Sequence, residues 1–437
     1  MKKIETALIS VSDKTNLKSI LQILKKNNVK IISSGGTFKK IKKLKYKCLE
    51  VSDFTGFDEI LEGRIKTLHP KIHAGILNKR KNKSHLNDLK KNDFENIDLV
   101  IVNFYPFEQT LKKTLDNKKI IENIDIGGPT LVRAAAKNFN DVTVITSIDQ
   151  YSELIDQLKT NKGSTLLEFR ERMARVAFSE TAYYDSVISN YFNKNSKINF
   201  PQKKVIYGNL IEKLRYGENP HQESAVYSQS SDINIKKLHG KQLSYNNYND
   251  IFAALTISKS LPKNKGVVIV KHTNPCGVSI LKKDLSSFKH ALACDPISAF
   301  GGIVSCNFKV TKTLAIELNK IFFEAIIANG FDKDSLKILK LKKNLRIIDA
   351  SYLQLNEIFK FNSLNNSILI QSEDRKSLSK KNFKIVSKKK PSKSQLDDLI
   401  FAFNVCRYVK SNAIVLVSDL STIGIGSGQT SRLDSCK

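Results

Sequence analysis

The residues of this 437-residue chain whose types and spacing best suit chemistry are 271–277, KHTNPCG. They follow the apolar, β-branched run 266–270, GVVIV, which predicts a buried strand. Histidine can move a proton near neutral pH, and the ammonium of Lys271 disfavours a second positive charge on His272. The carboxyl end of a strand is where open α/β sheets place their chemistry, so we expect a Lys–His pair at such an edge. The alternative is a proline-containing turn with two solvated cations.

Small and polar residues follow each strand predicted in the first 150 residues. Gly35 and Gly36 precede a helix, where backbone N–H groups can approach an anion. Convergence of the junctions on one sheet edge predicts a phosphate site. A zinc site at His69 and His73 is disfavoured, because Pro70 breaks the helix spacing and no acidic ligand accompanies them. The junctions are SVSDK (10–14), SSGGT (33–37), GRIKTLHPKIHAG (63–75), VNFYPF (102–107) and IDIGGPTLVRAAAKN (124–138).

The elements that must position these residues alternate between strands and helices. Alternating β and α patterns predict a mainly parallel sheet that is covered on both faces. Residues 149–195 are expected to be helical throughout, and the polar stretch 194–202 is a candidate boundary. A second α/β region begins near 203. The predicted strands are 4–11, 29–33, 97–103, 142–146, 267–270, 302–306 and 412–418, and the predicted helices include 129–138 and one that carries Leu17, Ile20, Leu21 and Leu24 on one face.

Composition excludes several classes of protein. Apolar residues make up 41% of the chain, which indicates a globular protein, and no apolar run approaches the roughly 18 residues that span a bilayer. No signal peptide precedes the first strand and six scattered cysteines form no C-x-x-C pair, so a cytoplasmic, reduced location is expected. The net charge of +30 is dispersed, with runs at 39–47 and 376–393, and favours a solvated surface over a nucleic-acid footprint.

The whole chain resembles the family of bifunctional purine-biosynthesis enzymes that join AICAR transformylase to IMP cyclohydrolase. The resemblance is carried, in family order, by the five junctions above and by LRYGENPHQ (214–222), GKQLSYNNYND (240–250), KHTNPCG, DPISAFGG (295–302) and SNAIVLV…TIGIGSGQTSR (411–432). It implies an α/β fold with a methylglyoxal-synthase-like cyclohydrolase domain at 1–148, a helical connecting segment at 149–200 and a transformylase domain of deaminase-like α/β subdomains at 201–437.

For the first domain, the resemblance implies closure of the purine ring of formyl-AICAR with loss of water. The implied catalytic residues are Lys66, Tyr105, Asp125 and Lys137, with Lys137 as the general acid/base that Asp125 orients. The remaining residues implied for this site bind the nucleotide, chiefly its phosphate: Ser12, Lys14, Ser34, Gly36, Thr37, Arg64, Thr67 and Asn103.

For the second domain, the resemblance implies formyl transfer from 10-formyltetrahydrofolate to the amino group of AICAR. His272 would take the proton of that weakly nucleophilic amine, and Lys271 would stabilise developing negative charge. The implied substrate contacts are Arg215, Tyr216, Asn247, Gly301, Glu324 and Asn412, with Arg432 near the folate. The implied partners are AICAR, formyl-AICAR, IMP, the folate co-substrate and a second copy in a homodimer, without metal, redox cofactor, nucleic acid or membrane.

The chain departs from the family at its end, because the family continues beyond the string that stops at Arg432. We therefore expect the last part of the second transformylase subdomain to be missing. A fragmentary sequence is favoured over a genuinely short protein, but the residues leave both open. In either case ring closure is expected to be the more secure activity. Two other classes stay open as alternatives: a basic nucleic-acid-binding protein, and a ligand-sensing module built on the first domain.

Overall fold

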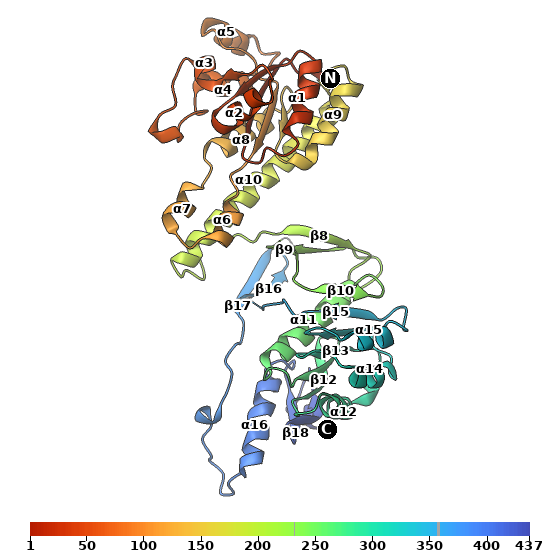
Figure 1. The fold of residues 1–437 in the computed structure, drawn as a ribbon. Coiled ribbons are helices and arrows are strands. Elements are labelled where there is room, and N and C mark those ends of the chain that lie inside the picture. Colours follow the sequence, from red (N-terminus) through yellow and green to blue (C-terminus); the bar gives the residue numbers. More distant parts are fainter. Residues whose placement is uncertain (231, 356–358) are drawn as a thin grey trace. The chain divides into compact units, whose positions relative to one another are not determined.

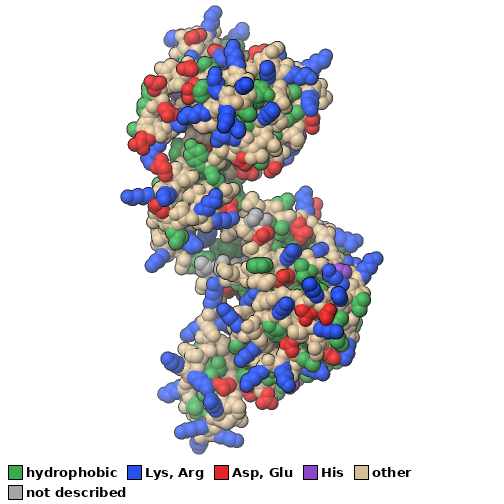
Figure 2. Space-filling view, viewed as in Figure 1, with side chains coloured by type: hydrophobic (Ala, Val, Ile, Leu, Met, Phe, Trp, Pro, Cys, Tyr) green, Lys and Arg blue, Asp and Glu red, His purple; other side chains and the backbone are tan. Residues whose placement is uncertain are grey.

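The computed structural model describes residues 1–230, 232–355 and 359–437, and the chain divides into two compact units (Figure 1). Unit 1 comprises Met1–Tyr207 and unit 2 comprises Gly208–Lys437. Among the described residues, no helix is long and apolar enough to cross a membrane. Lys and Arg side chains spread over the visible face, with Asp and Glu interspersed (Figure 2), so the positive charge forms a solvated surface rather than one concentrated stripe there.

Unit 1 is built on a five-stranded sheet in which every pairing is parallel, in the order β4-β3-β2-β5-β6. Its central strands are apolar and buried on both faces, as parallel strands flanked by helices require. The predicted strands are confirmed to within about two residues at each end. The strands are β2 (Thr6–Val11), β3 (Lys30–Ser33), β4 (Leu49–Glu50), β5 (Leu99–Asn103) and β6 (Thr143–Ile145).

The helices of unit 1 bury their apolar stripes against this sheet. Leu17, Ile20, Leu21 and Leu24 of α1 are all buried, as their helical spacing predicts. Helix α1 packs with α9, and α8 packs with α4 and α10. The helices are α1 (Leu17–Lys26), α2 (Gly35–Lys43), α3 (Val51–Thr55), α4 (Pro70–Leu77), α5 (Lys83–Lys91), α6 (Phe107–Lys113), α7 (Asn117–Glu122), α8 (Gly127–Lys137), α9 (Tyr151–Thr160) and α10 (Leu167–Asn195), with 3₁₀ turns at Leu61–Gly63 and Ile148–Gln150.

The expectation that 149–195 is helical throughout is wrong. Helices α9 and α10 are separated by a turn at Gly163, whose φ of 81° favours glycine, and by strand β7 (Ser164–Thr165). Strand β7 pairs with β1 (Lys2–Lys3), so the chain must break its helix to meet the N-terminal strand. The buried side chains of α10 are part of the core of unit 1, so α10 belongs to that unit.

Unit 2 is built on an eight-stranded mixed sheet in the order β10-β15-β14-β13-β11-β12-β19-β18. Strands β13, β14 and β15 are parallel, and the other neighbouring pairs are antiparallel. The strands are β10 (Lys236–His239), β11 (Val267–Lys271), β12 (Asn274–Ser279), β13 (Ile303–Cys306), β14 (Ala325–Ala328), β15 (Arg346–Asp349), β18 (Ile414–Ser418) and β19 (Ser421–Gly426), with separate hairpins β8 (Asn209–Leu214)–β9 (Ser224–Ser228) and β16 (Phe359–Leu364)–β17 (Ser367–Ser372).

Strand β11 shows that this sheet is covered on both faces. Val267 and Ile269 belong to one buried cluster, and Val268 and Val270 belong to another, because side chains alternate across a strand. At Gly277 an added β-carbon would lie 1.8 Å from the carbonyl oxygen of Ala291, so only glycine lets β12 approach α12 this closely. The helices are α11 (Tyr245–Ser260), α12 (Asp284–Cys294), α13 (Pro296–Ala299), α14 (Lys312–Asn319), α15 (Lys333–Leu339), α16 (Lys393–Cys406) and α17 (Arg432–Cys436), with a 3₁₀ turn at Lys380–Asn382.

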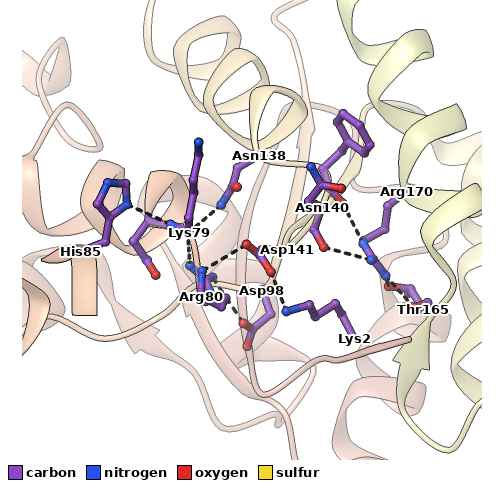
Figure 3. Close-up of polar contacts among 12 residues, drawn as sticks. Lys2, Lys79, Arg80, His85, Asp98, Asn138, Asn140, Asp141, Thr165 and Arg170 are labelled. Carbon is purple, nitrogen blue, oxygen red and sulfur yellow. Dashed lines mark hydrogen bonds and ion pairs between the residues drawn. The ribbon is translucent and has the colours of Figure 1, made fainter. Parts of the chain in front are cut away.

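A polar network ties together the amino ends of β2, β5 and β6 in unit 1 (Figure 3). Asp98 accepts hydrogen bonds from the backbone N–H groups of Glu5 and Thr6 at 3.0 and 3.1 Å, and its other oxygen lies 3.4 Å from Arg80. Asp141 accepts from the backbone N–H of Arg80 at 3.1 Å and pairs with Lys2 at 2.5 Å. The network therefore joins the start of the chain to the edge opposite the predicted phosphate site.

We predict that Asp98→Ala destabilises unit 1 by about 3 kcal/mol, because it leaves the largely buried guanidinium of Arg80 without its carboxylate. Urea unfolding combined with hydrogen exchange at the amides of Glu5 and Thr6 measures the loss. The exposed carboxylate of Asp88, on α5, provides the control, and Asp88→Ala is expected to leave both readouts unchanged. Unaltered exchange at Glu5 and Thr6 in Asp98→Ala would contradict the assignment.

Candidate functional site

The predicted phosphate-site junctions of unit 1 meet at one edge of its sheet. Because β2, β3 and β5 are parallel, their carboxyl ends lie together, with Val11 opposite Asn103 and Ile9 opposite Ser33. The loops that begin at Ser12, Ser34 and Phe104 therefore start side by side. This is the edge at which open α/β sheets bind ligands.

Two ammonium groups flank the amino terminus of α2. A β-carbon built on Gly36 would lie 3.8 Å from Nζ of Lys14, and one built on Gly35 would lie 3.3 Å from Nζ of Lys66. Ser34, the N-cap residue, makes no side-chain capping hydrogen bond. A nine-residue helix thus presents its first N–H groups between two cations, an arrangement that favours an anion.

Two of the predicted binding residues hold the loops around this terminus. The hydroxyl of Thr37 accepts from the N–H of Val11 at 3.0 Å and donates to the carbonyl of Val11 at 2.9 Å. The amide of Asn103 accepts from the N–H of Asp13 and donates to its carbonyl, both at 2.9 Å. Thr37 and Asn103 therefore fasten α2 and the loop after β2, and any contact they make with a ligand is additional to this role.

The cations of the GRIKT string lie on a loop, residues 57–68. This loop brings the side chain of Lys66 to the start of α2. Its tip has left-handed backbone at Leu61, Glu62 and Gly63, with φ of 53°, 55° and 86°. The φ of Gly63 favours glycine, and a β-carbon there would lie 2.5 Å from Cε of Lys66, so a side chain at this position would move the lysine. Lys66 pairs with Glu59 at 3.0 Å in this arrangement.

Asp125 sits over the start of α8 beside Thr67. Its carboxylate accepts from the N–H of Gly128 at 2.8 Å and of Tyr105 at 3.4 Å. A β-carbon on Gly128 would lie 2.5 Å from the carboxylate, and one on Gly127 would lie 3.0 Å from the hydroxyl of Thr67. Burial raises the pKa of Asp125 above its ordinary value, although both backbone hydrogen bonds act in the opposite direction. Asp125 is thus a desolvated carboxylate with a fixed orientation.

The structure does not bring Lys137 next to Asp125. Lys137 is the last residue of α8, which has 11 residues, so the helix separates the two positions by about 15 Å along its axis. Lys137 is exposed, and no hydrogen bond or ion pair joins it to Asp125 within the described part of the chain. The expected orientation of Lys137 by Asp125 is therefore absent from this arrangement. Tyr105 lies beside the carboxylate through its backbone and has a side chain that is 49% exposed.

Sequence reasoning missed three residues that touch this site. Tyr184 of α10 accepts from the N–H of Asp125 at 2.8 Å and donates to the carbonyl of Asn123 at 3.3 Å, and burial raises the pKa of Tyr184 to about 12. Glu59 and Glu122 pair with Lys66 and Arg64. No local pattern marks Tyr184, which lies 59 residues from Asp125 and has the spacing of an ordinary core aromatic.

In unit 2, His272 and Thr273 form the two-residue turn between β11 and β12. Both have left-handed backbone, with φ of 50° and 62°, which is uncommon for histidine and rarer for a β-branched residue. Asp250 of α11 holds the turn by accepting from the N–H of His272 at 3.3 Å and of Thr273 at 2.6 Å. The imidazole of His272 is exposed at this turn. The contacts from Asp250 maintain the uncommon backbone conformation.

The expectation that this motif lies at the carboxyl edge of a parallel sheet is wrong. Lys271 does end β11, but β11 runs antiparallel to β13, with Val270 opposite Ile303. The turn therefore meets the amino ends of β13, β14 and β15. The rule for open parallel sheets does not apply, because the chain returns by a hairpin rather than by a helical crossover.

Several predicted transformylase residues lie at the same edge as the turn. Lys271 donates to the carbonyl of Phe300 at 2.8 Å, next to Gly301, whose φ is 74°. Glu324, just before β14, pairs with Arg346 at 2.5 Å. Strand pairing and these bonds place the KHTNPCG and DPISAFGG strings together.

Of the remaining predicted residues, the two asparagines use part of their hydrogen-bonding capacity internally. Asn247 is buried and completes the capping box of α11 by accepting from the N–H of Ser244 at 3.1 Å. Asn412 donates to the carbonyls of Gln429 and Thr430, each at 3.1 Å. The loop after β8 carries Arg215, exposed and 5.9 Å from the ring of Tyr216, and α17 begins with Arg432, also exposed.

Among the described residues no group of three or more His, Cys, Asp or Glu side chains has the arrangement of a metal site. A cavity of about 310 Å³ lies in unit 2 between β8 and the start of α11. It is lined by the hydrogen-bonded side chains of Glu212 and Tyr248 together with apolar residues such as Leu243 and Ile348.

The AICARFT/IMPCHase bienzyme family model matches residues 135–437, and a model of the MGS-like domain matches residues 16–130. Unit 1 therefore contains a methylglyoxal-synthase-like domain, as the sequence strings predict. A solved structure titled "Crystal structure of ForH" covers 43% of the chain at 28% identity, with a TM-score of 0.40, which is too low to support an argument about the fold.

Curated relatives match along the whole chain. The bifunctional purine biosynthesis protein PurH of Bradyrhizobium diazoefficiens is 43% identical over 100% of this chain and 84% of its own length. PurH of Leptospira biflexa is 45% identical over 100% of this chain and 85% of its own length, and that of Acetivibrio thermocellus is 42% identical over 99% and 86%. The chain thus belongs to the family of bifunctional AICAR transformylase/IMP cyclohydrolase enzymes of purine biosynthesis.

Proposed function

We propose that unit 1 closes the ring of formyl-AICAR and that unit 2 transfers the formyl group to AICAR from 10-formyltetrahydrofolate. The observations that carry the first assignment are the start of α2, where Lys14 and Lys66 flank helix N–H groups, and the partly buried carboxylate of Asp125 at the start of α8. The second rests on the His272 turn and on membership of the family.

In ring closure the phosphate of the nucleotide would sit at the start of α2, bound by backbone N–H groups and by Lys14 and Lys66. The carboxamide nitrogen attacks the formyl carbon, a carbon–nitrogen bond forms, and the formyl oxygen leaves as water. Asp125 is placed to accept a proton of the attacking nitrogen, and Tyr105 would stabilise negative charge on the formyl oxygen. The carboxamide nitrogen and the formamido nitrogen each give up one proton, and these two protons leave with the formyl oxygen as water. Because the reacting groups belong to one molecule, positioning supplies much of the acceleration.

Lys137 is not used in the proposed ring closure. It ends α8 about 15 Å along the helix from Asp125, next to Asn138, whose amide donates to the carbonyls of Ile76 and Asn78 near the opposite edge of the sheet.

Thr67 and Ser12 border the edge of the proposed nucleotide site and are proposed to bind the nucleotide. Thr37 and Asn103 are proposed to contribute mainly by fixing the loops that surround it.

In formyl transfer the amino nitrogen of AICAR attacks the formyl carbon, and the bond from that carbon to N10 of the folate breaks. His272 would take the proton from the attacking nitrogen, and N10 gains a proton as it leaves. Lys271, held against the carbonyl of Phe300, would stabilise the charge that develops on the formyl oxygen. Asp250 contributes by keeping the imidazole on its turn.

We propose that ring closure is the more secure of the two activities. Thr67 is buried and Asp125 is partly buried, which strengthens electrostatic interactions there, whereas His272 is exposed. A homodimer, expected from the resemblance, and a cytoplasmic location, expected from the N-terminal sequence and the cysteine pattern, are proposed together with these activities. Sedimentation of the purified chain tests whether it forms a homodimer.

Separate assays of the two half-reactions test the division of labour. His272→Ala is expected to reduce formyl transfer to AICAR by roughly 10²–10⁴-fold while ring closure of supplied formyl-AICAR is unchanged. Lys66→Ala is expected to reduce ring closure and to leave formyl transfer to AICAR unchanged. His290→Ala, on the exposed surface of α12, is the matched control and should preserve both activities. Loss of ring closure in His272→Ala would contradict the assignment of the two units.

The pH dependence of ring closure tests Asp125. A carboxylate accepts a proton only when ionised, and burial raises the pKa of Asp125 above the ordinary 3.8. The rate is therefore expected to fall as the pH drops through this raised pKa, so that the acid limb lies above pH 3.8. Asp125→Asn should lower kcat by roughly 10²–10⁴-fold and remove the limb. Asp156→Asn, on the exposed side of α9, is the control and should keep both the kcat and the acid limb of the wild type. An acid limb that survives in Asp125→Asn would refute the role of Asp125 as the proton acceptor.

A further inference from the structure

Both cations of the 57–68 loop are paired with carboxylates. Nζ of Lys66 lies 3.0 Å from Oε2 of Glu59. Arg64 donates from Nε and Nη2 to the two oxygens of Glu122, at 3.3 and 2.5 Å. These pairings occupy the same donor groups that a nucleotide would need.

The surroundings of Lys66 explain why a carboxylate lies there. The start of α2 carries partial positive charge, and Lys14 and Lys66 add two unit charges beside it. Such a group of cations repels itself unless an anion is close. Glu59, which comes from the same loop as Lys66, supplies one negative charge at that point.

The geometry at Arg64 indicates the same role for Glu122. A guanidinium that donates two hydrogen bonds to the two oxygens of one carboxylate uses the same N–H groups with which arginine binds a phosphate. The hydrogen bonds within the pair raise the pKa of Arg64 and lower the pKa of Glu122, so both stay ionised at neutral pH. Glu122 ends α7, three residues before Asp125, so its pair with Arg64 joins the loop to the segment that carries this partly buried carboxylate.

Neither pair is held tightly. The side chains of Lys66 and Glu59 are 31% and 58% exposed, and those of Arg64 and Glu122 are 67% and 59% exposed. Ion pairs with this exposure contribute little to stability because solvent screens them. A phosphate carries up to two charges and three acceptor oxygens, so it competes favourably with a single carboxylate for the same donors.

We propose that the carboxylates of Glu59 and Glu122 take the place of the phosphate when no nucleotide is bound. They hold Lys66 and Arg64 at the site until the phosphate of the nucleotide displaces the two carboxylates. The inference rests on the proposed nucleotide site and goes beyond it, because it names the residues that set the affinity for the phosphate. Glu59 and Glu122 are positioning residues that act through the two cations. Their removal frees donors for the ligand, so binding becomes tighter rather than weaker.

Calorimetric titration with IMP and with inosine, which lacks the phosphate, tests the proposal on the full chain. Glu59→Gln and Glu122→Gln are each expected to lower the Kd for IMP by about two- to fivefold and to leave inosine binding unchanged. Asp58→Asn removes the same charge from the same loop at a carboxylate without a bonded partner among the described residues, and should change neither titration. In steady state the KM for formyl-AICAR is expected to fall in both glutamine variants.

Four results would overturn the inference. They are weaker or unchanged IMP binding in the glutamine variants, an equal gain for inosine, a gain in Asp58→Asn as large as that in Glu59→Gln, and a KM that does not fall. Wild-type protein that binds IMP no better than inosine would instead refute the proposed nucleotide site, and the inference with it. Phosphate-dependent binding in the wild type together with unresponsive variants would refute the inference alone.

Discussion

The parallel pairing of β2 with β3 on one side and β5 on the other is the constraint on which the unit 1 site depends. It places the end of β2 beside the end of β5, although Val11 and Asn103 are about ninety residues apart in the chain. Short polar bonds then fasten the loops, with Thr37 bound to Val11 and Asn103 bound to Asp13. At the opposite edge, Asp98 and Arg80 fix the amino ends of the same strands. The cations at α2 therefore rest on a frame that is held at both edges.

The sequence predicted this frame well because parallel strands buried on both faces are uniform apolar runs, and such runs follow from composition alone. It also predicted the junction loops, because glycine pairs mark positions where a side chain is excluded, as at Gly128 against Asp125. It failed at β11, because an apolar run predicts a strand but not the direction of its neighbours. It failed again at 161–166, where pairing of β7 with β1 overrides local helical preference. Tertiary pairing decided both cases.

The parts of the site that local rules miss share a backbone feature. Leu61, Glu62, His272 and Thr273 are all left-handed without being glycine, against their intrinsic preference. Intrinsic propensities do not place such residues at the tip of a turn. The sequence therefore predicted only a loop around Leu61 and the end of a strand before His272. In the second case the compensating interaction is visible, since Asp250 binds both N–H groups of the turn. Strain maintained by a specific partner is typical of segments that present a functional side chain.

Because the chain carries an excess of positive charge, the few acidic residues around the site affect its electrostatics more than their number suggests. With 72 Lys and Arg against 42 Asp and Glu, the basic side chains outnumber the carboxylates, so they cannot all have a carboxylate of their own. Yet Lys66 and Arg64 are both paired, Lys66 with Glu59 of its own loop and Arg64 with Glu122 at the end of α7. A cation that is already oriented loses less side-chain entropy when its anion is exchanged than one that moves freely. This saving in entropy is smaller than the cost of displacing the carboxylate, so the internal anion lowers the affinity for phosphate while it keeps each cation in place, and each pair must stay exposed for the exchange to occur.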